Sequence, residues 1–94
     1  MTQQSQVTDN KAESRFELAV EGRIAFAQYR LEEGKIAFTH TIVPEELEGQ
    51  GVGSGLVKQA LDAARAQNLK VVPMCSFVRG YIERHAEYQD LLAP

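Results

Sequence analysis

The sequence predicts a mixed α/β domain of the α+β type, in which an antiparallel three-strand meander precedes a strand-helix-strand unit and a C-terminal helix. Three observations carry this prediction. Apolar and polar residues alternate over residues 14–43, in segments separated by Glu-Gly pairs. A glycine-rich turn then leads into an amphipathic segment. A short apolar run follows that segment, so this run would lie parallel to the third strand in one sheet.

The meander is expected over residues 14–20, 23–32 and 35–43. Its turns fall at Glu21-Gly22 and Glu33-Gly34, where glycine permits a positive φ. In the first strand, the alternation places three apolar residues on one face: Phe16, Leu18 and Val20. In the third strand it places four residues on one face: Ile36, Phe38, His40 and Ile42.

The strand-helix-strand unit begins after Pro44, which ends the third strand because it has no N–H to donate. The helix is expected over residues 53–68, and its apolar stripe consists of Leu56, Val57, Ala60, Leu61 and Ala64. The next strand is expected over residues 70–76. Its Pro73 fits if the strand diverges there from its neighbour, which gives a splayed parallel pair. A second helix over residues 77–85 and a packed terminal segment over residues 86–94 complete the chain.

Length and composition limit the classes of protein to consider. Ninety-four residues make one domain, expected over residues 13–94 after a polar, disordered tail at residues 1–12. No apolar run approaches the roughly 18 residues of a membrane helix, and no signal peptide is visible, so we expect a cytoplasmic protein that binds no membrane. The net charge of −3 comes without a basic stripe, which argues against nucleic-acid binding. We expect no metal site.

The stretch HTIVPEELEGQGVGSGL at residues 40–56 suggests a function, because glycine recurs at alternate positions: Gly49, Gly51, Gly53 and Gly55. Such a turn, with a helix opening just after it, offers unobstructed and unpaired N–H groups to a phosphate or diphosphate. The nucleotide P-loop motif G-x-x-x-x-G-K-[ST] is excluded because no glycine of this turn is followed by lysine. The dinucleotide fingerprint G-x-G-x-x-G fails because its last place falls on Ser54 or Leu56. The alternative is a tight loop that only lets the helix pack closely.

The order of meander, Pro-Glu-Glu-Leu loop, G-x-G-x-G, helix and parallel strand resembles the GNAT superfamily of N-acetyltransferases. It resembles most its smallest members, which contain little more than an acetyl-CoA-binding core. The resemblance covers about residues 14–92 and rests on HTIVPEELEGQGVGSGLVKQALDAAR and PMCSFVRGYIERHAEYQDL. The superfamily motif [QR]-x-x-G-x-[GA] falls on Glu48, Gly51 and Gly53. Its first place is usually Arg or Gln, so Glu48 is a departure. Because the loop amides are the main phosphate ligands, we expect binding to survive, weakened by the carboxylate.

This resemblance implies that acetyl-CoA is the cosubstrate. Its diphosphate would bind the amides of residues 50–55, and its pantetheine arm would lie between the splayed strands, bonded to backbone near Ile42 and Val43. The residues that the resemblance implies for cofactor binding are Ile42, Val43, Glu48, Gly49, Gln50, Gly51, Val52, Gly53, Ser54, Gly55, Ser76 and Phe77.

Acetyl transfer to an amine needs a base, an oxyanion donor and an acid for the departing thiolate. His40 and Cys75 each lie near the C-terminal end of a predicted strand, where ligands collect in open α/β sheets, and could face one another. We predict His40 as the base, since imidazole ordinarily titrates near neutral pH; a core histidine is the alternative. Cys75 could be an acetyl acceptor, an acid or a core residue. The resemblance implies Tyr81 as the acid, against a core role.

The function predicted from these residues is acetyl-CoA-dependent N-acetyl transfer to an amine, either a small molecule or a protein lysine. Two alternatives remain: a module or sensor that binds CoA without turnover, and a small interaction domain without CoA. For the assembly we expect a monomer or a weak homodimer.

Overall fold

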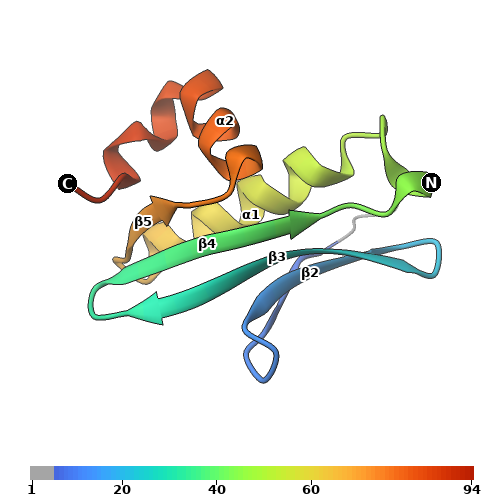
Figure 1. Ribbon diagram of the computed structural model, residues 1–94, viewed down its shortest axis with the longest axis horizontal. Helices are drawn as coiled ribbons and strands as arrows, with labels where there is room; N and C mark the ends of the chain where they lie inside the picture. The colour runs from blue at the N-terminus through green and yellow to red at the C-terminus, as the bar shows by residue number, and fades with distance from the viewer. Residues whose placement is uncertain (1–5) are drawn as a thin grey trace.

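The computed structural model describes residues 6–94, which form one mixed sheet with helices packed along it (Figure 1). In chain order the elements are β1 (Thr8–Asn10), β2 (Arg15–Val20), β3 (Arg23–Glu32), β4 (Lys35–Ile42), the 3₁₀ helix η1 (Glu45–Leu47), α1 (Val52–Ala66), β5 (Lys70–Pro73), α2 (Ser76–Arg84) and the 3₁₀ helix η2 (Ala86–Leu91). The five-stranded sheet has the order β1-β2-β3-β4-β5. Within the described residues no helix is long and apolar enough to cross a membrane.

The predicted meander is confirmed, since β2 pairs antiparallel with β3 and β3 with β4. The alternation of the sequence explains which face is buried. Phe16 and Leu18 in β2 lie opposite Ala27 and Ala25 in β3, and all four are at most 4% exposed. This face packs against α1, whose predicted apolar stripe from Leu56 to Ala64 is fully buried. The core therefore lies between the sheet and the helices.

The prediction of a disordered tail over residues 1–12 is wrong for residues 8–10, which form β1. Residues 1–5 lie outside the described part of the chain. Strand β1 pairs antiparallel with β2, and two side-chain bonds hold it: Tyr29 donates its O–H to Asp9 at 2.6 Å, and Asn10 donates to Glu17 at 3.0 Å. This short strand is polar, so no apolar pattern marks it.

A β-bulge in β4 changes the face on which His40 lies. Phe38 is opposite Tyr29, and His40 is opposite Gln28, so one extra residue, Thr39, stands between the two pairs. Directly opposed residues share a face of a sheet, so the buried face holds Phe38 and Thr41, and the other face holds His40 and Ile42. The prediction that His40 and Ile42 share a face with Phe38 is therefore wrong.

The parallel pair is confirmed, and it is short. Strand β5 pairs with β4 only from Lys70 to Pro73, where Pro73 lies opposite Phe38. Beyond this point β4 continues to Ile42 without pairing to β5, and the chain that follows β5 turns into α2 (Figure 1). The amides of Met74 and Cys75 both donate to the carbonyl of Phe38, at 3.0 and 3.1 Å. The two strands therefore part after Pro73, as predicted, and the unpaired end of β4 leads toward the glycine-rich turn.

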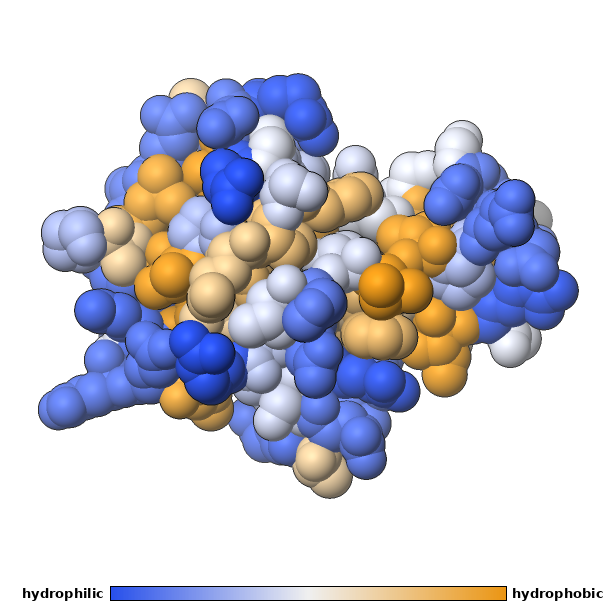
Figure 2. All heavy atoms as spheres, viewed as in Figure 1, coloured by the Kyte–Doolittle hydropathy of each residue, from blue (hydrophilic) through white to orange (hydrophobic). Residues whose placement is uncertain are grey.

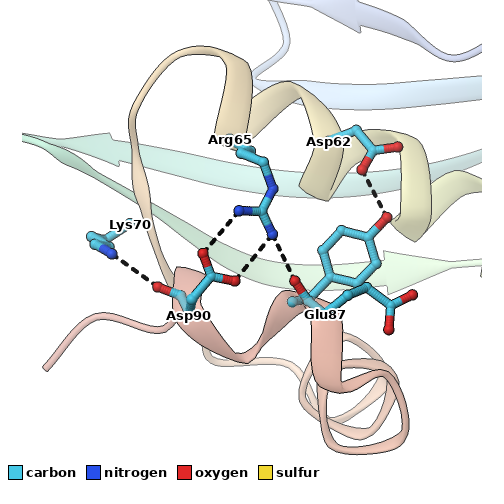
Figure 3. A network of polar contacts seen from close by, with 6 residues as sticks. Asp62, Arg65, Lys70, Glu87 and Asp90 are labelled. Carbon is cyan, nitrogen blue, oxygen red and sulfur yellow. Dashed lines mark hydrogen bonds and ion pairs between the residues drawn. The ribbon is translucent and has the colours of Figure 1, made fainter.

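The C-terminal segment is fastened to α1 by polar contacts (Figure 3). Arg65 donates to the carboxylate of Asp90 at 2.8 and 3.1 Å and to the carbonyl of Glu87 at 2.7 Å. Lys70 donates to the carbonyl of Asp90, and the hydroxyl of Tyr88 donates to Asp62 at 2.7 Å. We call this set of contacts the C-terminal latch. It holds η2 beside the second half of α1.

Candidate active site

A cavity of about 500 Å³ lies where β4, the glycine-rich turn and the start of α2 meet. Figure 2 shows the surface indented between the part of the molecule formed by α2 and the part formed by η1 and the end of β4. The lining residues are Thr41, Ile42, Val43, Leu47, Glu48, Gly49, Gly51, Val52, Gly53, Ser54 and Phe77. Nine of the twelve predicted cofactor-binding residues are thus gathered in one cavity wall. Gln50, Gly55 and Ser76 lie outside it.

The start of α1 supplies the polar groups of this cavity. Gly51 has a φ of +77°, in the left-handed region that suits glycine, and no side chain caps the helix. A helix leaves its first N–H groups without intrahelical partners. Among residues 6–94, the N–H groups of residues 51–54 have no backbone hydrogen bond. These four donors lie at the positive end of the helix dipole.

The amide of Gly55 does not belong to this set. It donates to the carbonyl of Gly51 at 3.0 Å, closing the first helical turn. The predicted anion-binding run over residues 50–55 is therefore too long at its C-terminal end.

The absence of a side chain at Gly53 gives the cavity its shape. A Cβ placed there would lie 2.5 Å from Cζ of Phe77 and 3.2 Å from Cγ2 of Val43. Only glycine lets the ring of Phe77 pack this closely on the helix start. Phe77 is 38% exposed, so its ring forms part of the wall rather than part of the core.

The charge on the cavity wall is negative. Glu48 is the one ionisable residue among the lining residues, all of which are described. On the nearby η1, Glu46 forms an exposed ion pair with Arg23 at 3.3 Å. An anion in the cavity would therefore depend on backbone N–H groups rather than on Lys or Arg side chains.

Thr41 is a lining residue that the sequence pattern missed. It lies on the buried face of β4 because of the bulge, and its hydroxyl is 3.2 Å from the sulfur of Cys75. The N–H of Val78 donates to the same sulfur at 3.4 Å, so that Cys75 caps the start of α2. Cys75 thus stands directly behind Thr41, and the side chain bonded to it across the split is Thr41 rather than the predicted His40.

The other two predicted catalytic residues lie away from the lining. His40 is exposed on the opposite face of β4, next to Thr41 in the chain. Tyr81 is 4% exposed and stacks on His85 with ring centroids 3.9 Å apart. Burial raises the pKa of Tyr81, which makes its phenol a poorer acid. Within residues 6–94 no group of three or more His, Cys, Asp or Glu residues could hold a metal ion.

The arrangement of a split parallel pair, a glycine-rich turn and an open helix start can be compared with known proteins. The family model of GCN5-related N-acetyltransferases matches residues 15–91. The chain belongs to the GCN5-related N-acetyltransferase, or GNAT, family. The match covers every element from β2 to η2, and therefore the whole cavity. Membership supports acyl transfer as the reaction class of the chain.

A solved structure is similar to this chain over nearly its whole length. It is the NMR solution structure of a GCN5-like protein from Staphylococcus aureus, which superimposes with a TM-score of 0.73 and 33% sequence identity. The alignment covers 94% of this chain and 87% of that chain. The two chains therefore share their fold over most of their aligned lengths.

Proposed function

We propose that this chain transfers an acetyl group from acetyl-CoA to an amine, either a small molecule or a protein lysine. The observation that supports this most is the cavity, which joins four unpaired N–H groups at the start of α1 to the split between β4 and β5. The donors suit a diphosphate, and the split provides strand edge for an extended arm.

The residues of the cavity fit CoA. Its diphosphate would be held by the N–H groups of residues 51–54, where Gly51 has open space in place of a side chain. Its pantetheine arm would bind along Ile42 and Val43, at the part of β4 that has no β5 partner. When bound, acetyl-CoA supplies a thioester, which is an activated acyl group.

His40 is the proposed base, in spite of its distance from Cys75. It is exposed on the open face of β4, at the level of Thr41, which lies on the cavity face. An amine could therefore approach the split from the side opposite the cavity. Its nitrogen attacks the thioester carbonyl carbon, so a C–N bond forms and the C–S bond breaks. The amine proton goes to the imidazole of His40, and the departing thiolate takes a proton from solvent.

A CoA-release assay with acetyl-CoA and a panel of amines, including lysine peptides, tests this function. His40→Gln is expected to lower kcat about 100-fold, because positioned general bases contribute roughly 10² to 10⁴. The same variant should bind CoA as tightly as the wild type by calorimetry, because His40 does not line the cavity. An unchanged kcat would remove His40 from the mechanism.

One observation favours the second candidate, a module that binds CoA without turnover. Glu48 places a carboxylate in the wall of the anion site, where it opposes a diphosphate. CoA binding without acetyl transfer or hydrolysis across the amine panel would support this candidate against the enzyme. Intact-protein mass spectrometry after incubation with acetyl-CoA tests the remaining prediction for Cys75, since an acetyl-enzyme would identify it as an acceptor.

A further inference from the structure

The split between β4 and β5 is not open along its whole length. Its closed part ends at Phe38, whose carbonyl accepts from the amides of both Met74 and Cys75. Three residues further along β4, the hydroxyl of Thr41 and the sulfur of Cys75 lie 3.2 Å apart. At this point a side-chain contact, and not a backbone hydrogen bond, therefore joins β4 to the chain that follows β5.

Both members of this link are held in place. Thr41 points to the buried face because its opposite residue in β3 is Ala27, which is fully buried. Cys75 is fixed by the N–H of Val78, 3.4 Å away, at the start of α2. The link thus connects a strand to a helix cap, and both are anchored in the core through Phe38 and Val78.

The same link forms the end of the cavity. The lining on β4 runs from Val43 back to Thr41, and Thr41 is the lining residue nearest the paired part of the sheet. A ligand that is anchored at residues 51–54 and extends along β4 would therefore have its far end against Thr41. Behind Thr41 lies Cys75, whose sulfur is 3.2 Å from the Thr41 hydroxyl, so a longer acyl chain would have to displace this contact.

We propose that Thr41, fastened to Cys75, determines acyl specificity by ending the cavity after a short acyl group. This inference rests on the proposed use of acyl-CoA thioesters. It assigns Thr41 a role in selecting the acyl group, and it gives Cys75 a positioning role that needs no covalent intermediate. Because a pocket of fixed length discriminates a single methylene by about 10- to 200-fold, the effect should be large enough to measure.

The test compares the dissociation constants of CoA, acetyl-CoA and butyryl-CoA by calorimetry in the absence of an amine. In the wild type, butyryl-CoA should bind more weakly than acetyl-CoA. Thr41→Ala removes the hydroxyl and releases Cys75, so the ratio of the butyryl to the acetyl dissociation constant should fall about tenfold. Thr41→Ser keeps the hydroxyl and should retain most of the wild-type ratio. Cys75→Ala should lower the ratio in the same direction as Thr41→Ala.

CoA without an acyl group is the internal reference, because the affinity of each thioester is compared with the CoA affinity of the same protein. A ratio that stays at the wild-type value in Thr41→Ala, in a protein that still binds acetyl-CoA, would overturn the assignment and leave the proposed function standing. If no thioester and no CoA bind the wild type, the proposed function fails and this inference fails with it.

Discussion

The two ends of helix α1 are built in opposite ways. At its C-terminal half, side chains satisfy one another: Arg65 binds Asp90 and the carbonyl of Glu87, and Asp62 accepts from Tyr88 (Figure 3). At its start, within residues 6–94, no side chain caps the helix and the N–H groups of residues 51–54 have no backbone partner. Unsatisfied donors cost stability unless water or a ligand pairs with them. The difference indicates that one end of the helix serves the fold and the other serves a ligand.

The strongest test of this difference between the two ends adds one methyl group at each of two glycines in the first turn of α1. In Gly53→Ala the new Cβ would meet the ring of Phe77, whereas at Gly55 nothing lies within 4 Å. Overpacking costs about 1–3 kcal/mol, and 1.4 kcal/mol already equals tenfold in affinity. If this cost falls on the bound state, Gly53→Ala should lower CoA affinity by about 5- to 150-fold in calorimetry.

Gly55→Ala is the matched control. It should leave CoA affinity unchanged and raise the free energy of unfolding by roughly 1 kcal/mol, because alanine favours a helix over glycine. Equal losses of affinity in the two variants would mean that the Phe77 contact does not shape the binding site.

At the latched end, Tyr88→Phe removes one hydroxyl from a buried ring and its 2.7 Å bond to Asp62. The free energy of unfolding, measured by urea denaturation, should fall by about 1 kcal/mol, the usual net value of such a bond. CoA affinity should not change. A variant that unfolds like the wild type but binds CoA more weakly would show that the two ends are coupled.

Glu48→Gln sharpens the description of the open end. Removing the carboxylate from the cavity wall should tighten CoA binding a few-fold, since an exposed charge interaction contributes about 0.2–1 kcal/mol. The gain should shrink at high ionic strength because salt screens it. Titrations at low and high salt measure both effects, and weaker binding by the variant would show that Glu48 contributes a hydrogen bond instead.

The smallest effect is a pH dependence confined to the latch. Hydrogen bonding from Arg65 lowers the pKa of Asp90. Burial alone would raise the pKa of Asp62, but hydrogen bonds from Tyr88 and Lys58 outweigh it and lower that pKa as well. A carboxylate whose pKa is lower in the folded state than in the unfolded state stabilises the fold when the pH is above its unfolded-state pKa. This contribution is lost as the pH falls through its folded-state pKa. Amide exchange in η2 should therefore accelerate relative to β3 below about pH 4, and uniform acceleration would contradict the latch.

Much of the fold follows from local pattern. Alternation identified β2, β3 and β4, and the apolar stripe of α1 identified its buried face. Pro73 marked the point where the parallel strands part, because a missing N–H has a direct structural consequence. The same logic located the cavity, since Gly49 and Gly51 are required by their positive φ and Gly53 by the close approach of Phe77.

Other features depend on contacts that no local pattern records. The bulge at Thr39 has no glycine or proline to mark it, yet it moves His40 to the open face and Thr41 to the cavity. Strand β1 is held by Asp9 bonded to Tyr29, twenty residues away. The pairing of the Gly55 amide depends on where the helix starts, which sequence reading places only within a few residues.

An NMR titration of the ¹⁵N-labelled chain with CoA tests the central assignment most directly. The account predicts large shifts for the amides of residues 51–54, a smaller shift for Gly55, whose amide is already bonded to Gly51, and none for the latch residues Arg65 and Asp90. Shifts confined to other parts of the chain, or no shifts at millimolar CoA, would contradict it.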